Sequence, residues 1–314
     1  MLLTRLRKFN TLFLFLSEVD NISLVAWSTN TVLLLDNVTV DSSQQAQGNL
    51  IPNFFRSIVK AVSVIIPAMN EAEGIGCTLE ALPIVELSKL GYSTEVLVVD
   101  GCSTDNTLEI ARSKGAKIIV EPRRGYGRAY KTGFQNSVGD YIVTMDADGS
   151  YPAQQIPQLL DYLVKSDLDL VTTCRLNNLQ PGAMSVSHRF GNEILNLFSR
   201  VFFRLNLRDT QSGMWVFKRS LLETVGVRSD SMAFSQEFKI RSFQKASCQE
   251  LPISYIARKG KQKINTFRDG YSNLKSMCGL LRNKETRALV PALGAQQLLA
   301  HNVAIPQPNV LQKT

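Results

Sequence analysis

The segment Tyr141-Ile-Val-Thr-Met-Asp-Ala-Asp-Gly-Ser-Tyr-Pro152 joins an apolar run to two closely spaced acids. Its apolar run, 141–145, predicts a buried strand that ends in a turn. Asp146 and Asp148 stand just past the strand end, where both carboxylates can face the crevice above a parallel sheet. Two such oxygen ligands suit Mg²⁺ or Mn²⁺ carrying a phosphate, although a lone pair of this kind is more often a solvated acidic turn.

The composition indicates a folded protein with anionic partners. Hydrophobic residues make up 44% of the 314 residues, enough for a sizeable core, and charged residues at 20% argue against global disorder. The formal net charge of +8 points to nucleic acid, phosphorylated ligands or a lipid surface. The five cysteines are scattered without a Cys-x-x-Cys pair, which argues against a disulfide framework or a zinc site and favours a reducing compartment.

Residues 1–58 differ from the rest and are expected to form a partly ordered extension. Their apolar runs, 12–16 and 32–35, fall short of the roughly 20 residues that a membrane span needs. The basic and apolar start resembles a signal peptide, but no small-x-small cleavage site follows it. An appended segment that rests on a membrane is the favoured interpretation, with the domain boundary near 54–60.

From residue 61 strands alternate with helices, which predicts an α/β fold with a mostly parallel sheet covered on both faces. The expected strands are 62–66, 95–99, 117–120, 141–145, 168–172, 210–217 and 251–256. The first expected helix begins near Asn70, its N-cap, and continues past Pro83 to about Leu90. The other expected helices are 103–113, 128–137, 155–164, 181–203, 235–244 and 271–281. This pattern predicts a domain over 59–287 and a loosely attached tail over 288–314.

Acidic residues also follow the first two strands of this region. Glu71 comes after 62–66, and Asp100 directly follows 95–99. In a doubly wound sheet these positions share one edge with Asp146 and Asp148, so their side chains can face the same ligand crevice. A nucleotide there would find acceptors for its base and ribose at Glu71 and Asp100 and a metal at Asp148. Each acid alone could be an ordinary turn or helix-terminus residue.

A second group of candidates is cationic. Four cations surround Gly125 and Gly127, namely Arg123, Arg124, Arg128 and Lys131. The glycines fail the dinucleotide fingerprint because its third position is Tyr130, so we interpret them as letting the backbone approach a phosphate at a helix N-terminus. Further cations follow at Arg175, Arg189 and along 258–263, with a solvated basic surface as the alternative interpretation.

Over residues 61–270 the sequence resembles glycosyltransferases of family 2, which have the nucleotide-sugar-binding GT-A fold. Within this family it resembles the dolichyl-phosphate mannosyl- and glucosyltransferases, the polyprenyl-phosphate hexose synthases. The motifs that carry the resemblance are Ile66-Pro-Ala-Met-Asn-Glu71, Val99-Asp-Gly-Cys-Ser-Thr-Asp105, Gly127-Arg-Ala-Tyr-Lys-Thr-Gly133, Met145-Asp-Ala-Asp148, Asp209-Thr-Gln-Ser-Gly213, Glu237 and Pro252-Ile-Ser-Tyr-Ile-Ala-Arg258. The chain departs from the family at Gly101, where a second acid is frequent, at Met214-Trp215, where relatives carry Arg, and at Gln262, where they carry Ser.

The resemblance implies an inverting transfer of a hexose from UDP-glucose or GDP-mannose to a polyprenyl monophosphate, whose ionised oxygens need no general base. It implies catalytic roles for Asp146, Asp148 and Asp209, with Mg²⁺ or Mn²⁺ on Asp146 and Asp148. It implies donor contacts from Pro67, Met69, Glu71, Asp100, Ser103, Arg128, Lys131, Asp146 and Ala147. The phosphate contacts that it implies are Arg175, Arg189, Arg258 and Lys263.

The expected partners are the nucleotide-sugar donor, the lipid acceptor and a membrane surface, with no nucleic acid. No pair of membrane spans follows Leu281, so we expect peripheral attachment at the cytoplasmic face of a membrane through 258–263 and 271–281. A sugar hydroxyl or a small phosphate as acceptor, and a catalytically silent nucleotide-sugar or membrane-binding module, remain alternatives. The failed glycine fingerprint argues against a dehydrogenase.

Overall fold

The computed structural model describes residues 12–18, 21–28, 31–38, 60–260 and 266–282. The chain divides into two compact units, Met1–Ile58 and Val59–Thr314. The first unit contains an antiparallel sheet with the order β1 (Leu12–Glu18), β2 (Asn21–Ser28) and β3 (Thr31–Val38). Our expectations contain no strand here. The sequence pattern that could have predicted these strands is three strand-length segments, separated by two residues each, which is the commonest loop length of β-hairpins.

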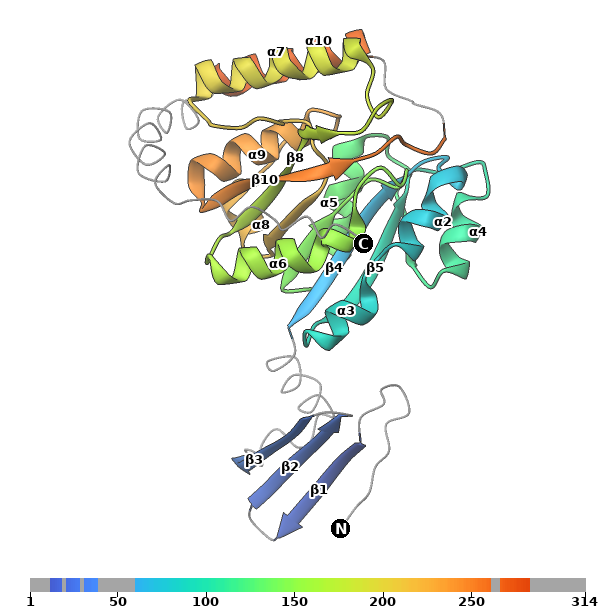
Figure 1. The fold of residues 1–314 in the computed structure, drawn as a ribbon, viewed down its shortest axis with the longest axis vertical. Coiled ribbons are helices and arrows are strands. Elements are labelled where there is room, and N and C mark those ends of the chain that lie inside the picture. The colour runs from blue at the N-terminus through green and yellow to red at the C-terminus, as the bar shows by residue number, and fades with distance from the viewer. Residues whose placement is uncertain (1–11, 19–20, 29–30, 39–59, 261–265, 283–314) are drawn as a thin grey trace, which may run out of the picture. The chain divides into compact units, whose positions relative to one another are not determined.

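The second unit is built on a seven-stranded sheet with the order β10-β8-β9-β7-β4-β5-β6 (Figure 1). Its strands are β4 (Ala61–Ala68), β5 (Ser93–Asp100), β6 (Lys117–Val120), β7 (Tyr141–Thr144), β8 (Leu170–Leu179), β9 (Trp215–Lys218) and β10 (Cys248–Tyr255). Every pairing is parallel except those of β9, which runs antiparallel to β7 and β8. The predicted α/β fold with a mostly parallel sheet is confirmed.

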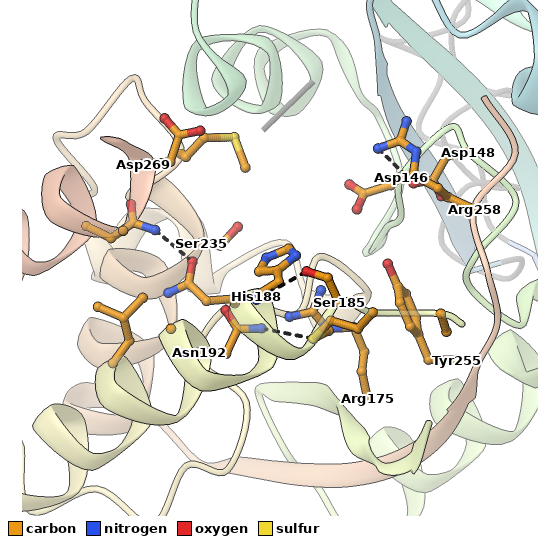
Figure 2. A pocket seen from close by; sticks show the side chains of 18 of the residues that line it. Asp146, Asp148, Arg175, Ser185, His188, Asn192, Ser235, Tyr255, Arg258 and Asp269 are labelled. Carbon is orange, nitrogen blue, oxygen red and sulfur yellow. Dashed lines mark hydrogen bonds and ion pairs between the residues drawn. The ribbon is translucent and has the colours of Figure 1, made fainter. Parts of the chain in front are cut away.

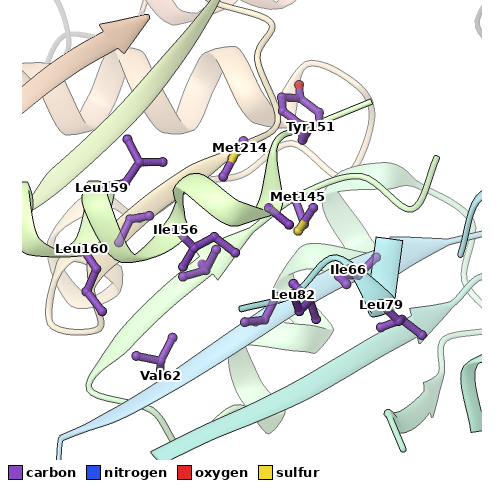
Figure 3. Packing of buried hydrophobic residues seen from close by; sticks show 14 of the residues in the cluster. Val62, Ile66, Leu79, Leu82, Met145, Tyr151, Ile156, Leu159, Leu160 and Met214 are labelled. Carbon is purple, nitrogen blue, oxygen red and sulfur yellow. The ribbon is translucent and has the colours of Figure 1, made fainter. Parts of the chain in front are cut away.

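Helices cover both faces of this sheet because its strands are apolar on both sides. Val64 and Ile66 of β4 belong to a core shared with α2 and α6, and part of this core is seen in Figure 3. Ile65, between them, points to the opposite core, which contains Tyr130 and Phe134 of α5. The helices that form these layers are α2 (Ala72–Glu80), α3 (Ile84–Lys89), α4 (Thr107–Ser113), α5 (Tyr126–Asn136), α6 (Ile156–Lys165), α8 (Leu221–Val225) and α9 (Phe234–Lys245), with a short 3₁₀ turn at Ala153–Gln155.

Two long helices, α7 (Val186–Phe203) and α10 (Thr266–Arg282), pack side by side at the top of Figure 1. Leu195 and Phe203 of α7 meet Met277 and Leu280 of α10 in a third apolar cluster, together with Ile240 of α9. Within the described residues, no helix combines the length and the apolar character that crossing a bilayer would require.

The first expected helix is wrong in its continuity and in its cap. It divides into α2 and α3 at Pro83, because a proline disfavours the helical conformation of the residue before it and lacks an N–H. Asn70 does not cap α2 but has a φ of 55°, and its side-chain oxygen accepts the Thr104 N–H at 2.7 Å. The expected strand 210–217 begins only at Trp215, because the preceding segment turns into the site described below.

Candidate active site

A cavity of about 450 Å³ lies at the carboxyl ends of the central strands. Residues that belong to or follow β7, β8 and β10 form one part of its wall, and helices α7 and α10 form another (Figure 2). Open α/β sheets bind ligands at this edge, because the strand ends there expose loops and helix termini to one crevice. Of the predicted site residues, the cavity brings together Asp146, Asp148, Arg175 and Arg258.

Asp146 and Asp148 follow β7, as predicted, and hydrogen bonds hold both carboxylates. The hydroxyl of Tyr126 donates to Asp146 Oδ1 at 2.9 Å. The backbone N–H and the hydroxyl of Ser150 donate to Asp148 Oδ1 at 3.0 and 2.6 Å. The two acids are therefore positioned by the fold before any ligand arrives.

The electrostatics of this pair fit a divalent cation. Burial, and then the charge of Asp148, raise the pKa of Asp146 to about 6 against the hydrogen bond from Tyr126. A cation beside both carboxylates would offset these two effects, and oxygen ligands are those that Mg²⁺ and Mn²⁺ prefer. Among the described residues, no group of three or more His, Cys, Asp or Glu side chains is arranged so that it could hold a metal ion.

Helix α2 packs directly against this acidic loop at Gly74. A Cβ atom at this position would lie 2.6 Å from Asp148 Cα and 2.7 Å from the carbonyl oxygen of Ala147, and real Cβ atoms essentially never show such contacts. Both neighbours are backbone atoms and cannot rotate away. The absence of a side chain at Gly74 therefore sets the height of the acidic loop above the sheet.

We expect Gly74→Ala to push the acidic loop away from α2 and to lower turnover on the order of a hundredfold, since small misplacements of reacting groups cost that much. Turnover with Mn²⁺ and calorimetric Mn²⁺ binding in the presence of a nucleoside diphosphate would measure the effect. The matched control is Gly279→Ala in α10, where an added Cβ meets nothing within 4 Å. Unchanged Mn²⁺ affinity in Gly74→Ala would show that the loop does not depend on this contact.

Arg258 joins two of the predicted site loops. Its Nη2 lies 3.1 Å from each carboxylate oxygen of Glu71, and its Nη1 lies 3.6 Å from Asp148 Oδ2. The backbone N–H of Lys259 donates to the carbonyl oxygen of Asp148 at 2.8 Å. The segment after β10 therefore closes over the acidic loop and ties Glu71, which directly precedes α2, to the same site.

Arg175 reaches the cavity from β8, and Asp209 holds it from behind. Nε and Nη2 of Arg175 donate to the Asp209 carboxylate at 2.7 and 2.9 Å, and both side chains are buried. Although burial acts to raise it, the charge of Arg175 lowers the pKa of Asp209 to about 2. Asp209 is absent from the cavity wall, so the structure places this predicted catalytic acid as the partner of Arg175.

Hydrogen bonds with two other side chains hold the backbone of Asp209. Glu250 accepts the N–H groups of Arg208 and Asp209, both at 2.9 Å, and Lys239 donates to the Asp209 carbonyl oxygen at 2.8 Å. Burial lowers the pKa of Lys239 to about 8 and raises that of Glu250 to about 7. Through Asp209, these groups fix the guanidinium of Arg175 at the cavity.

Several polar cavity residues are missing from our sequence predictions, among them Tyr126, His188 and Asn192. The N–H of His188 donates to the hydroxyl of Ser185, which caps α7, at 3.3 Å. Burial, and then the charge of Arg175, lower the pKa of His188, so its imidazole is neutral at pH 7. The available signal was that His188 is one of two histidines in the chain. No sequence pattern pairs Tyr126 with Asp146.

The predicted donor residues after β4 and β5 form a hydrogen-bonded group of their own. Ser103 donates to the Asp100 carboxylate through its N–H, at 2.9 Å, and through its hydroxyl, and it accepts the Asn70 N–H at 2.8 Å. Asp100 is fully buried, whereas we expected its side chain to face the crevice. Pro67 lies one residue before the end of β4, and Met69, just after β4, is exposed. Their part in donor binding stays a prediction.

Arg128 and Lys131 have a different partner in the structure. Arg128 pairs with Asp230, and Lys131 Nζ lies 2.8 Å from the same carboxylate. A Cβ on Gly125 would collide with the carbonyl oxygen of Asp230, and one on Gly127 would collide with the start of α9. Close packing against Asp230 and α9 thus accounts for the absence of side chains at both glycines, and their predicted contact with a phosphate stays a prediction.

The remaining predicted residues lie apart from one another. Ala147 is buried between the two acids. Arg189 is exposed on α7 and does not line the cavity. Lys263 lies outside the described residues.

Comparison with known proteins gives matches over most of the second unit. A family model described as glycosyl transferase family 2 matches residues 63–226. The low-salt glycan biosynthesis hexosyltransferase Agl6 of Haloferax volcanii is 35% identical over 223 residues, which cover 70% of this chain and 54% of that protein. The chain thus spans about half the length of this relative. The dolichyl-phosphate hexose transferase of the same organism is 30% identical over 219 residues, or 69% of this chain and 92% of that protein.

Among solved structures, the chain resembles glucosyl-3-phosphoglycerate synthase from Mycobacterium tuberculosis in complex with Mn²⁺, UDP and glucosyl-3-phosphoglycerate. The TM-score is 0.57 and the identity 21%, over 72% of this chain and 82% of that chain. At this identity the likeness concerns the fold. It agrees with the seven-stranded, mostly parallel sheet described above.

Proposed function

Because this chain belongs to glycosyltransferase family 2, we propose that it transfers a hexose from a nucleoside-diphosphate sugar to a polyprenyl monophosphate, with inversion. One observation carries the proposal. The carboxylates of Asp146 and Asp148 and the guanidinium of Arg175 line a single cavity. Its acidic part suits a metal-bound diphosphate, and its cationic part suits an acceptor that is itself a phosphate. The relative named dolichyl-phosphate hexose transferase supports this acceptor class.

The donor would bind at the acidic loop. Asp146 and Asp148 would hold Mg²⁺ or Mn²⁺, which when bound neutralises charge on the leaving diphosphate. Arg258 would add a cation beside the same phosphates, since its Nη1 already lies 3.6 Å from Asp148 Oδ2. The nucleoside would extend toward the ends of β4 and β5, over Pro67, Met69, Glu71, Asp100, Ser103 and Ala147. The choice between UDP-glucose and GDP-mannose rests on those loops.

The acceptor phosphate would bind at Arg175. Asp209 takes the Nε and Nη2 donors of its guanidinium at 2.7 and 2.9 Å, which aims the group and leaves Nη1 for a ligand. Neutral His188 offers a further ring nitrogen on the cavity wall. A phosphate oxygen is ionised near pH 7, so it can attack the anomeric carbon without a general base. This chemistry agrees with the position of Asp209, which lies outside the cavity wall and is already paired with Arg175.

A transfer assay with Mn²⁺ tests the proposal by pairing UDP- and GDP-hexoses with three acceptors. These are a short-chain prenyl phosphate, the corresponding prenyl alcohol and glycerol phosphate. We expect transfer to the prenyl phosphate, none to the alcohol, and loss of transfer in chelator. Preferential transfer to glycerol phosphate would replace the lipid by a small phosphate acceptor. Transfer to the alcohol, or to none of the three, would remove the proposal.

Asp100→Ala is expected to weaken binding of the nucleotide, because Asp100 holds the donor loops through Ser103. A lost buried hydrogen bond costs about 1 to 3 kcal/mol, or roughly 5- to 150-fold in affinity. Calorimetric titration with the nucleoside diphosphate measures this, and the exposed Asp167→Ala is the control. Unchanged nucleotide affinity would mean that Asp100 serves only the turn.

Three further predictions accompany the proposed function. Residues 1–58 would form an extension, 59–287 the catalytic domain and 288–314 a tail. The lipid acceptor requires a membrane surface, and we place the enzyme peripherally at a cytoplasmic face, with no nucleic acid as partner. The basic loop 258–263 that we expected to bind this surface lies only in part within the described residues.

A further inference from the structure

Helix α7 presents an apolar face outward. Val186 is 85% exposed and Phe190 is 68% exposed, although α7 belongs to a well-packed unit. The exposed residues that we call the outer apolar face are Val186, Phe190, Ile194, Leu197 and Val201, with Phe202 beside them. Their spacings of four, four, three and four residues place them on one side of the helix.

The opposite side of α7 packs against the rest of the second unit and lines the cavity. Leu195 and Phe203 are buried against α10 and α9, and His188, Asn192 and Leu195 line the cavity. The helix therefore separates the cavity from the outer apolar face. Single exposed apolar residues are ordinary on protein surfaces, but a contiguous row along one helix marks an interaction site.

Cations lie beside this row. Arg189 and Arg200 of α7 and Arg204, directly after it, are exposed. Glu193 is the one exposed acid of α7, and its carboxylate lies 3.7 Å from the guanidinium of Arg200. The adjacent helix α10 adds exposed Lys275 and Arg282. An apolar face with a cationic border is complementary to a bilayer whose headgroups are anionic, whereas a neutral protein groove would not require the border.

We propose that the outer apolar face of α7 docks on the surface of an anionic lipid bilayer, with the helix lying in the plane of the headgroups. The reason for such docking rests on the proposed function, in which the acceptor is a membrane lipid. Docking through α7 would bring the cavity, which the same helix lines, to the level at which a polyprenyl phosphate presents its phosphate while its chain stays in the bilayer. This surface is distinct from the basic loop 258–263 expected from the sequence.

Flotation with vesicles of phosphatidylcholine alone, or mixed with phosphatidylglycerol, tests the docking. The variant Phe190→Ser with Leu197→Ser removes apolar area from α7. Its matched control is Val85→Ser with Leu90→Ser, which removes exposed apolar area from α3 and the residue after it. We expect the α7 variant to lose at least about tenfold in binding to mixed vesicles and the control to bind as the parent does.

A second variant tests the charged border. Arg200→Gln with Arg204→Gln should remove most of the preference for phosphatidylglycerol over phosphatidylcholine and most of the salt dependence, because screened charge attraction supplies both. Thermal unfolding of each variant checks that these exposed substitutions leave the fold intact. Equal vesicle binding by the α7 variant and its control, or no binding by the parent protein, overturns the proposal.

Light scattering and a transfer assay distinguish bilayer docking from self-association of the chain. A parent dimer that Phe190→Ser with Leu197→Ser dissociates, without vesicle binding, would assign the face to a second copy of the chain and overturn the proposal. If the α7 variant transfers sugar normally to a water-soluble short-chain prenyl phosphate but not to lipid in vesicles, docking is supported. Vesicle binding through α7 without transfer to any prenyl phosphate would support docking and reject the proposed function.

Discussion

Asp148→Ala is expected to lower kcat/KM for sugar transfer by about a thousandfold or more. Asp148 is a buried carboxylate on the cavity wall, and Ser150 fixes one of its oxygens through two hydrogen bonds. Losing a ligand of the proposed divalent cation would remove several kcal/mol of charge stabilisation at the leaving diphosphate, and about 4 kcal/mol corresponds to a thousandfold in rate.

Transfer rates across a Mn²⁺ titration, and Mn²⁺ binding in the presence of a nucleoside diphosphate, measure this effect. Asp161→Ala is the matched control, since Asp161 is an exposed acid on α6 that pairs with Lys165 four residues on. The variant should bind nucleotide poorly in the presence of Mn²⁺ and show the same unfolding temperature as the control within a few degrees. Near-parental turnover of Asp148→Ala, or full activity in chelator, would refute the metal site.

Asp209→Ala is expected to destabilise the protein by about 3 to 5 kcal/mol, because it leaves the buried guanidinium of Arg175 without its partner. The pair also gives an acid dependence. The pKa of Asp209 is lowered to about 2, so its contribution to stability is present above about pH 4 and is lost as the pH falls toward 2. Chemical denaturation from pH 2 to 7 should show this loss in the parent protein and a smaller one in the variant.

The double variant Arg175→Met with Asp209→Leu separates stability from function. Replacing a buried pair by apolar residues is often neutral, so we expect most of the lost stability to return. Transfer to a phosphate acceptor should not return, because the proposed acceptor contact is gone, while nucleotide and Mn²⁺ binding should persist. Recovery of both stability and transfer would remove Arg175 from acceptor binding. The exposed pair of Lys114 and Glu80 provides a control whose disruption should change stability little.

The cavity therefore combines two electrostatic environments that the sequence presents far apart. Its acidic part comes from one loop after β7, and its cationic part comes from β8 and from the segment after β10. Arg258, in the cationic part, reaches Asp148 in the acidic part and also Glu71. This arrangement would accommodate a donor that carries a diphosphate together with an acceptor that is itself anionic. Substitutions at Arg175, in the cationic part, therefore test the acceptor class.

The alternation of strands and helices, the α/β class and the position of Asp146 and Asp148 at a strand end could all be predicted from the sequence. These features depend on patterns within a few residues, namely apolar runs of strand length and turn residues directly after them. The family motifs located Glu71 and Arg258 in the same way, whereas Arg175 stood outside those motifs as one of several candidate cations. Local patterns also gave a wrong prediction at Pro83. The apolar periodicity predicted one long helix, but the proline divides it into α2 and α3.

Which charged side chains face the cavity and which are paired elsewhere depends on tertiary packing. Asp209 pairs with Arg175, 34 positions away, and Asp230 pairs with Arg128, 102 positions away. No local sequence pattern could reveal that Asp209 holds a cation at the cavity, or that Asp230 pairs with both Arg128 and Lys131 away from it. Helix α7 shows the same limit. Its sequence is apolar on two sides, and only packing against α9 and α10 decides that Leu195 is buried while Phe190 is left facing outward.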